Sequence, residues 1–410
     1  MKKGSIIAHL DADCFYVSCE RIRNAGLKGK PVGVLGNQGA CIIAKSYELR
    51  AKGVATGIPI WDAHRLCPEA IYVKRDFQWY EVLSRLMLDL IKTYSLTVEY
   101  YSIDELFFDA SLLPIAFQSS MLDAAKALQQ RILKEIGLPV TIGIAETKLL
   151  AKLASDTAKP FGCTVWLNPE DRKALLKEKP VSDITGIAKR REKTLQSYGI
   201  YTCDQFVAAD RKLIRKLVTK MGEDMWWELN GISVLPLQTE RPPHKMVARG
   251  GSIGAASADR LRIEGWLIRN VERLVDALDH YGYVADQLGL YLGYKEGFGS
   301  YGSTNLLAPT ALFEDLAPAV RALFDYAFHE GKKIHYIHII AEHLQFKDHA
   351  QRSLFEKEKT RPTQTAIMRQ VNASAGRFAV RSAATLPLPD IYSDIANDYD
   401  ICDVYGKSCF

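Results

Sequence analysis

The stretch Tyr101–Ser102–Ile103–Asp104–Glu105 places two adjacent acids directly before the apolar run Leu106–Phe107–Phe108. A third acid, Asp11, ends another apolar run, Ile6–Leu10. Carboxylates beside buried strands are costly unless something neutralises them. A divalent cation does so with oxygen ligands, and two such ions about 3.5–4 Å apart serve an in-line phosphoryl displacement. Acids at strand ends are common, so this pattern alone leaves a metal site and a structural role both open.

Length and composition set wide limits around these acids. The 410 residues exceed one ordinary domain, and 48% hydrophobic with 25% charged residues is typical of a globular protein. No apolar stretch is long enough to span a membrane, and the first apolar run stops at Asp11, which argues against a signal peptide. The eight cysteines include no C-x-x-C pair, which favours reduced thiols in a cytosolic protein. The net charge of +5 is too mild to indicate nucleic acid by itself.

The first part of the chain alternates strand-like and helix-like patterns. Apolar runs predict strands over 6–10, 32–35, 41–44, 98–101, 106–109 and 140–144. Apolar residues at helical spacing predict helices over 78–94, 121–136 and 148–159. We therefore expect a mixed α/β core, with Asp104 and Glu105 near the bend of a hairpin.

Residues 170–220 have a helical pattern rich in Lys and Arg. Such a charge run is usually a solvated helix face. Gly186 and Gly199, however, mark two turns spaced by one helix, as in a helix-hairpin-helix, whose turn offers backbone N–H groups to a phosphate. The hairpin predicts DNA-binding positions at Gly186, Ala188, Lys189 and Arg190. Ala188 replaces the usual second glycine of such a hairpin, and its methyl group limits how closely the DNA backbone can approach there.

Beyond residues 239–242, where prolines indicate a linker, the pattern starts again. The order β-α-β-β-α-β over 243–346 is that of a ferredoxin-like split βαβ unit and predicts a separate second domain. The spacing of His335, His338 and His343 fits no usual zinc pattern, so ordinary histidines are expected. From residue 347 the chain becomes a polar tail.

Four segments resemble motifs of the Y-family DNA polymerases, the translesion enzymes, and they follow one another along the chain in the order of that family. Residues 10–20 resemble the opening motif of that family, and residues 101–105 match its Tyr-Ser-Ile-Asp-Glu box without change. Residues 46–68 resemble its finger segment, and residues 143–160 resemble the segment that closes the palm. The resemblance covers about residues 5 to 350.

The resemblance implies a multidomain α/β (α+β) fold, the right-hand polymerase. It implies a ferredoxin-like palm, small fingers, a helical thumb and a split βαβ little finger. The expected ranges are 1–27 with 75–165 for the palm, 28–74 for the fingers, 166–238 for the thumb, 239–242 for the linker, 243–346 for the little finger and 347–410 for the C-terminal tail.

The resemblance also implies roles for individual residues. Asp11, Asp104 and Glu105 would be catalytic and would hold two Mg²⁺ ions, or Mn²⁺ in their place, with the Ala12 carbonyl as a further ligand. The remaining positions would bind the nucleotide, since phosphoryl transfer needs mainly positioning and charge stabilisation; they are Phe15, Tyr16, Tyr47, Arg50 and Lys159.

Within this nucleotide set, Tyr16 would lie under the sugar and exclude a 2′-hydroxyl. The alternative is a core aromatic at Tyr16 and plain surface charges at Arg50 and Lys159. At Ala44, where several family members carry a small hydroxyl, and at Lys45, the residue before Ser46, the sequence departs from the family pattern. Whether these two positions contact the nucleotide is therefore left open.

The implied function is error-prone, template-directed DNA synthesis for lesion bypass in the cytoplasm, at the nucleoid, with primer–template DNA and deoxynucleoside triphosphates as partners. Residues 351–355 resemble the bacterial sliding-clamp motif, with Gln351, Leu354 and Phe355 as contacts and Arg352 in place of leucine. Local packing is the alternative for this peptide. Residues 376–381 resemble the branch of the SOS mutagenesis polymerases, which implies an SOS accessory subunit or recombinase as a further partner.

Two other functions compete with this interpretation. One is a catalytically inactive, DNA-bound scaffold of a mutagenesis complex, but all three acids are present. The other is a nucleotidyl cyclase, which can share the palm chemistry. The basic helical hairpin and the second split βαβ unit fit a duplex-gripping enzyme better than a cyclase.

Overall fold

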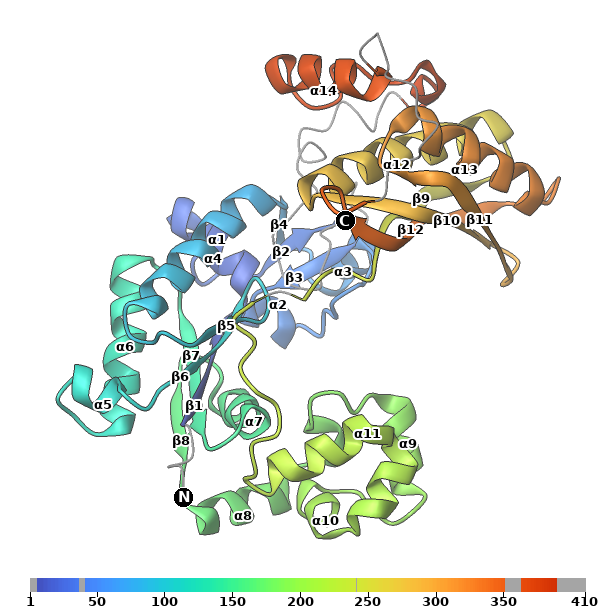
Figure 1. Cartoon of the computed structure of the whole chain (residues 1–410). Helices are drawn as coiled ribbons and strands as arrows, with labels where there is room; N and C mark the ends of the chain where they lie inside the picture. The colour runs from blue at the N-terminus through green and yellow to red at the C-terminus, as the bar shows by residue number, and fades with distance from the viewer. Residues whose placement is uncertain (1–5, 37–40, 241, 351–362, 389–410) are drawn as a thin grey trace. The chain divides into compact units, whose positions relative to one another are not determined.

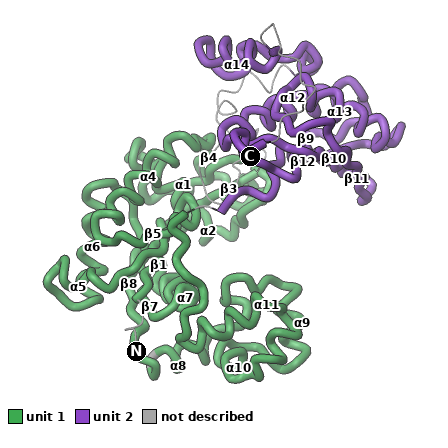
Figure 2. The backbone as a smooth tube through the Cα atoms, viewed as in Figure 1, with its two compact units in different colours: residues 1–241, 402–408 green, residues 242–401, 409–410 purple. Residues whose placement is uncertain are grey.

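The computed structural model describes residues 6–36, 41–240, 242–350 and 363–388 (Figure 1). The chain forms two compact units, the first reaching Arg241 and the second beginning at Pro242 (Figure 2). Within the described residues, no helix combines the length and the apolar character needed to cross a membrane.

The first unit is built on a five-stranded sheet in the order β5-β6-β1-β7-β8. Its strands are β1 (Ile7–Ala12), β5 (Val98–Tyr100), β6 (Glu105–Asp109), β7 (Val140–Ala145) and β8 (Cys163–Trp166). The central strand β1 runs antiparallel to both neighbours, and all six of its residues are buried. The predicted hairpin at the acids is confirmed, since β5 pairs antiparallel with β6.

Helices cover both sides of this sheet (Figure 1). Helix α7 (Lys148–Ala158) packs so closely on one face that a Cβ on Gly143 would lie 2.2 Å from the backbone nitrogen of Ser155. Helices α4 (Phe77–Lys92) and α6 (Met121–Glu135) contribute to the other side. The helices predicted over 78–94, 121–136 and 148–159 are thus confirmed to within a residue or two.

The segment predicted as fingers contains a second, three-stranded sheet in the order β3-β2-β4. Its elements are β2 (Val32–Leu35), β3 (Ile42–Lys45), α2 (Tyr47–Ala51), α3 (Ile60–Leu66) and β4 (Ile71–Lys74). Helix α1 (Phe15–Arg23) and η1 (Ala25–Leu27) connect β1 to β2, and α5 (Leu113–Ala116) follows β6.

The rest of the first unit is helical, as the sequence predicts for 170–220. Its elements are α8 (Pro169–Glu178), η3 (Val181–Asp183), α9 (Lys189–Gln196), α10 (Cys203–Ala208) and α11 (Arg211–Leu229). Asp210 caps α11 by accepting from the Leu213 N–H at 2.9 Å, and Thr219, at φ 73°, interrupts the helical backbone inside α11.

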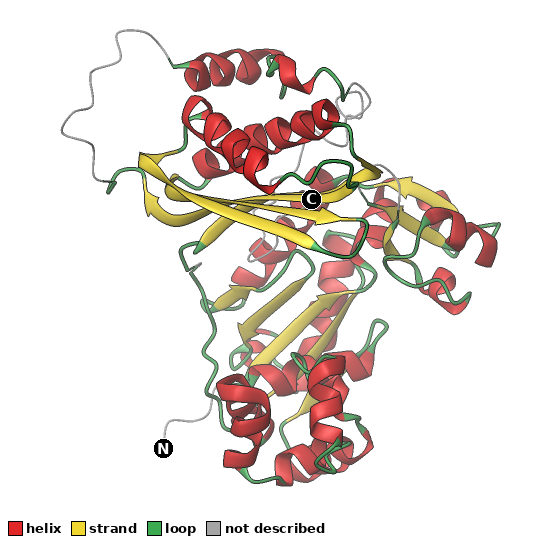
Figure 3. Cartoon of the chain, turned by 90° about the vertical axis from the view of Figure 1, so that its right-hand side faces the viewer, coloured by secondary structure: helices red, strands yellow, loops and turns green. Residues whose placement is uncertain are grey.

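The second unit has the predicted order β-α-β-β-α-β: β9 (Met246–Ser257), α12 (Arg260–His280), β10 (Tyr283–Tyr294), β11 (Gly299–Thr310), α13 (Phe313–Ala327) and β12 (Ile334–Phe346). The sheet is antiparallel in the order β11-β10-β12-β9, so each βαβ unit has a strand of the other inserted into it. Helices α12 and α13 lie on the same face of the sheet (Figure 3). Strand β11 is longer than the short strand predicted near Thr304. The prediction was too short because many positions of β11 are exposed, so its sequence has no continuous apolar pattern.

Part of the predicted polar tail is folded onto the second unit. Helix α14 (Gln364–Ala375) and η4 (Ala383–Thr385) follow the four-stranded sheet of the second unit in sequence. Near the start of α14, the Thr365 hydroxyl accepts from the Phe313 N–H at 2.7 Å and donates to Glu314 at 2.6 Å. Leu388 reaches the core beside α12.

Candidate active site

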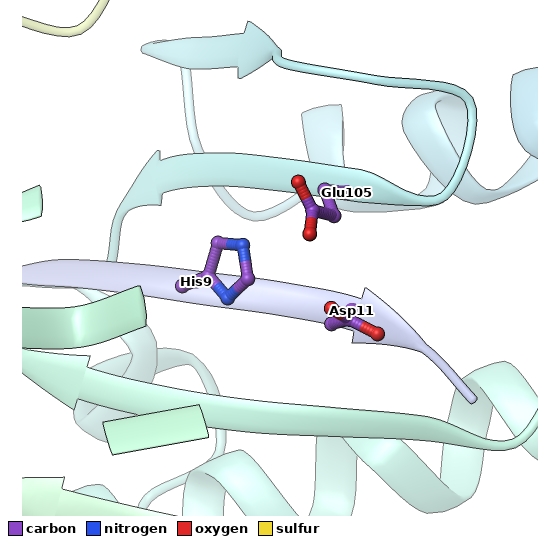
Figure 4. A group of neighbouring side chains, drawn as sticks. All are labelled: His9, Asp11 and Glu105. Atoms are coloured by element: carbon purple, nitrogen blue, oxygen red, sulfur yellow. The ribbon is translucent and has the colours of Figure 1, made fainter. Parts of the chain in front are cut away.

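The three acids of the sequence motifs meet where the neighbouring strands β1 and β6 of the five-stranded sheet come together, at the end of β1 and the start of β6. Asp11 lies near the end of β1, directly opposite Glu105, the first residue of β6, in antiparallel register. Asp104 precedes Glu105, and its backbone carbonyl accepts from the Ala12 N–H at 2.9 Å. The structure thus brings together residues that are distant in sequence (Figure 4).

Two lysines lie against these acids. Lys159 Nζ donates to Asp11 Oδ2 at 2.7 Å, and Lys152 Nζ donates to Glu105 Oε1 at 2.5 Å. Burial raises the pKa of Asp11 to about 7, with Glu105 and Asp104 adding to the rise and Lys159 opposing it. Buried carboxylates that share a site disfavour each other's ionisation. Such an oxygen donor set fits a divalent cation, which would restore the charge balance.

His9 belongs to the same group, although sequence reasoning missed it. One ligand atom each of His9, Asp11 and Glu105 lie within 4.8 Å of one another (Figure 4). His9 is two residues before Asp11 and therefore shares its face of β1. The ring is fully buried, its Nδ1 is 2.7 Å from Ser155 Oγ, and its pKa lies well below the ordinary value because of burial and nearby lysines. It is therefore a neutral imidazole at pH 7.

Asp13 is a second residue that sequence reasoning did not place in the site. Its carboxylate is 3% exposed and accepts three hydrogen bonds from separate segments. The donors are Thr141 Oγ1 at 3.0 Å, the Phe161 N–H at 2.9 Å and the Tyr47 hydroxyl at 3.1 Å. Asp13 thereby joins the palm sheet, the segment after Lys159 and the first residue of α2.

The residues expected to bind triphosphate lie around this junction. Tyr47 and Arg50 are both on α2, and the Arg50 guanidinium lies 5.1 Å from the centroid of the Tyr47 ring. Arg50 is exposed and makes no ion pair with the described residues. Lys159 follows α7 and also contacts Asp156 at 3.0 Å. Asp13 thus contacts both the segment that follows Lys159 and, through Tyr47, the helix that carries Arg50.

Phe15 and Tyr16 begin α1 and enter an aromatic cluster. The Tyr16 ring stacks on Tyr80, with centroids 4.6 Å apart and planes at 18°, and meets Phe77 edge-on. Phe15 is buried, whereas Tyr16 is half-buried. The stacking fixes the ring of Tyr16 and leaves part of it accessible, so the geometry suits both a core aromatic and a wall of a pocket.

The predicted DNA-binding positions lie together at the start of α9. Gly186 has φ +98°, in the region that favours glycine, and Ala188 is the N-cap residue. Lys189 and Arg190 are exposed in the first turn. The predicted clamp contacts Gln351, Leu354 and Phe355 lie outside the described residues.

A sheet with paired acids at its edge, a small second sheet, a helical segment and a separate split βαβ unit define the right-hand polymerase class. Two solved structures share this fold. The Y-family DNA polymerase chimera Dbh-Dpo4(243-245)-Dbh matches with a TM-score of 0.67 and 20% identity, over 82% of this chain and 98% of that chain. DinB from Sulfolobus solfataricus matches with a TM-score of 0.53 and 22% identity, over the same shares. The predicted fold class is thereby confirmed, while the residue ranges of its domains stay predictions.

The sequence comparisons identify the family. Residues 10–156 match the model of the impB/mucB/samB family, and residues 244–354 match that of its C-terminal domain. DNA polymerase IV 1 of Bacillus subtilis (strain 168) is 33% identical over 393 residues, and DNA polymerase IV of Bacillus velezensis is 30% identical over 392 residues. Each alignment covers 94% of both chains. The chain belongs to the impB/mucB/samB family, the Y-family translesion DNA polymerases. The finer placement in the SOS branch stays a prediction.

Proposed function

We propose that this chain is an active, error-prone, template-directed DNA polymerase that extends a primer past lesions with deoxynucleoside triphosphates. The observation that carries the proposal is the pairing of Asp11 with Glu105 across adjacent strands, next to Asp104 and Lys159. A scaffold that had lost catalysis would have no reason to keep buried acids at a cost in stability. The inactive-scaffold alternative therefore finds no support.

Asp11, Asp104 and Glu105, with the Ala12 carbonyl, would hold two Mg²⁺ or Mn²⁺ ions. When bound, these ions would lower the pKa of the primer 3′-hydroxyl and neutralise charge on the triphosphate. The donor chemistry fits, because burial and the nearby Glu105 and Asp104 raise the pKa of Asp11 and disfavour its ionised form until a cation is present. His9 supplies a neutral ring beneath the acid pair and adds no charge to the site.

The other residues of the site would bind and orient the nucleotide. Arg50 and Lys159 would neutralise the triphosphate, and the Tyr47 hydroxyl, held by Asp13, would contact it. The 3′-hydroxyl then attacks the α-phosphate and pyrophosphate leaves. Tyr16, fixed on Tyr80, would lie against C2′ of the sugar and exclude a 2′-hydroxyl.

Primer–template DNA would be held in part by the start of α9. A helix N-terminus with exposed Lys189 and Arg190 offers backbone N–H groups and positive charge to a phosphate. A sliding clamp, bound through Gln351, Leu354 and Phe355, and an SOS accessory subunit or recombinase remain predicted partners.

Primer extension on undamaged and abasic templates tests the proposal. We expect Asp104→Ala to lower extension at least about a hundredfold, because metal-assisted charge stabilisation contributes several kcal/mol. DNA binding, measured by fluorescence anisotropy, should be retained. Asp89→Ala, at an exposed position on α4, is the matched control and should extend normally. Near wild-type extension by Asp104→Ala would refute the polymerase assignment.

A further inference from the structure

Lys45 is a cation beside the start of α2, the helix that carries Tyr47 and Arg50, and the sequence motifs assign it no role. It is the last residue of β3, pairs in register with Gly33 and directly precedes Ser46, the N-cap of α2. Strand β3 also packs against α1, which carries Phe15 and Tyr16. Lys45 therefore lies where the fingers sheet meets the first acid motif.

The side chain of Lys45 has no carboxylate partner among the described residues. It is half-buried, and its Nζ donates at 2.8 Å to the neutral hydroxyl of Thr56. By contrast, Lys52, also in the fingers segment, is paired with Glu69 at 3.0 Å. Surface cations of this segment can thus find acids nearby, while Lys45 has only a neutral oxygen.

The neighbour of Lys45 is a second uncompensated cation. Lys45 directly precedes the N-cap of α2 and Arg50 is the fourth residue of that helix, two positions whose side chains meet at a helix start. In keeping with this, burial and the Arg50 guanidinium both lower the pKa of Lys45. Arg50 itself rests on the Tyr47 ring and makes no ion pair with the part of the chain that the structure describes. Two close like charges repel each other, and an anion that binds to both removes that cost. The pair is therefore a receptor for an anionic group.

The positions of these residues order them from the acids outward. Lys159 contacts Asp11, the Tyr47 hydroxyl contacts Asp13, Arg50 lies on Tyr47, and Lys45 lies across the first turn of α2 from Arg50. In this order Lys45 comes last. A triphosphate that reacts at the acids at its α-phosphate would extend its terminal phosphate toward Lys45.

We propose that Lys45 is a further phosphate-binding residue, which together with Arg50 contacts the terminal phosphate of the incoming deoxynucleoside triphosphate. The inference rests on the proposed function. It also explains how the chain can depart from the family pattern at Ala44 and Lys45 and still bind a triphosphate, because the ammonium supplies a contact that a small hydroxyl would otherwise give.

The alternative is a structural role, in which Lys45 only pins the turn that contains Thr56. Gly53 and Gly57 flank this turn with φ +81° and +86°. Loss of a structural contact would lower the melting temperature and would not distinguish one phosphate of the nucleotide from another. Loss of a terminal-phosphate contact would leave the melting temperature unchanged and would affect only substrates that carry the full charge on that phosphate.

Single-nucleotide insertion with two substrates separates these roles. One substrate is an ordinary deoxynucleoside triphosphate, and the other carries a methyl ester on its terminal phosphate, which removes one negative charge there. For Lys45→Met we expect the KM of the ordinary substrate to rise about tenfold with little change in kcat, as for a lost hydrogen bond to a charged group. In wild type the KM of the ester should be much higher than that of the ordinary substrate, and this difference should be smaller in Lys45→Met.

Two further variants complete the comparison. Lys45→Arg keeps the charge and should retain a low KM. Lys52→Met should behave as wild type, because the exposed Lys52 is already paired with Glu69. If Lys45→Met does not fold, Lys45→Gln carries the same comparison. Equal KM values and equal ester penalties in wild type and Lys45→Met would overturn the proposal, and so would a lower melting temperature with an unchanged KM.

A binding measurement keeps this test separate from that of the polymerase assignment. If wild type extends no primer, the proposed function fails, but calorimetry with inorganic tripolyphosphate still tests Lys45. Weaker binding by Lys45→Met than by Lys52→Met supports the phosphate contact. Equal binding by the two variants refutes it.

Discussion

Replacing Asp13 tests how the proposed nucleotide pocket is held together. The carboxylate of Asp13 is 3% exposed and is the common acceptor for Thr141, Phe161 and Tyr47. Asp13→Ala leaves the buried Thr141 hydroxyl and the partly buried Phe161 N–H without this acceptor. A buried donor without a partner costs about 1–3 kcal/mol. The half-buried Tyr47 hydroxyl can reach water, so its loss contributes little to stability.

We therefore expect Asp13→Ala to destabilise the first unit by about 2–4 kcal/mol, since removal of a costly buried charge offsets part of the two lost hydrogen bonds. For a unit of this size that corresponds to a fall of about 5–15 °C in melting temperature. Asp13→Asn should cost less than about 1 kcal/mol. Its amide oxygen can accept from the Phe161 N–H, while its NH₂ group donates to the hydroxyls of Thr141 and Tyr47, which can accept as well as donate.

Tryptophan fluorescence measures the effect on the correct unit, because five of the six tryptophans precede residue 241. The two units need not melt together, so this probe is preferable to a signal from the whole chain. In insertion assays Asp13→Ala should also raise the KM for the nucleotide, because Tyr47 loses its anchor, while Asp13→Asn should keep it low. Equal melting of wild type and Asp13→Ala would refute the reasoning. Equal losses of stability in Asp13→Ala and Asp13→Asn would show that the position requires the negative charge and not the hydrogen bonds.

The other predictions concern sugar selection, DNA binding and the clamp. Tyr16→Ala should raise ribonucleotide relative to deoxyribonucleotide insertion, because the stacked ring no longer fills the space at C2′; unchanged selectivity in single-nucleotide assays would contradict this. Lys189→Ala combined with Arg190→Ala should reduce the slope of log affinity against log salt by about 1.8, at about 0.9 per duplex phosphate neutralised; an unchanged slope in anisotropy titrations would remove both residues from the DNA interface. Leu354→Ala combined with Phe355→Ala should abolish stimulation by a sliding clamp with basal activity and melting temperature retained, whereas a lower melting temperature and no clamp effect would indicate local packing.

The acid pair could be predicted from sequence because its signal is local. Strand β1 is covered on both faces, so it appears as an apolar run, and the acid that ends the run stands out. The hairpin before β6 is equally local, since β5 and β6 are separated by only a few residues. Antiparallel pairing of β1 with β6 then places Asp11 opposite Glu105.

Asp13 and His9 could not be found in the same way, because what they do depends on partners far along the chain. Asp13 binds Thr141 and Phe161, and His9 contacts Ser155 on α7. In the sequence His9 is a single polar residue inside an apolar run, where a satisfied core histidine is the ordinary expectation. The useful signal was the period of two along β1, which puts His9 on the same face as Asp11.

The folded part of the tail was missed for a related reason. Polar contacts tie the folded tail to the second unit, such as Arg369 of α14 with Asp279 at 2.9 Å and Arg377, just after α14, with Asp276 at 3.1 Å. Single charged residues of this kind produce no apolar period from which docking could be predicted. The docking has a consequence for the clamp prediction. Ala350 and Thr363, on either side of the predicted clamp peptide, both belong to the second unit. A clamp bound to that peptide would therefore be tethered to the second unit, and the tether would raise the local concentration of this polymerase at the primer.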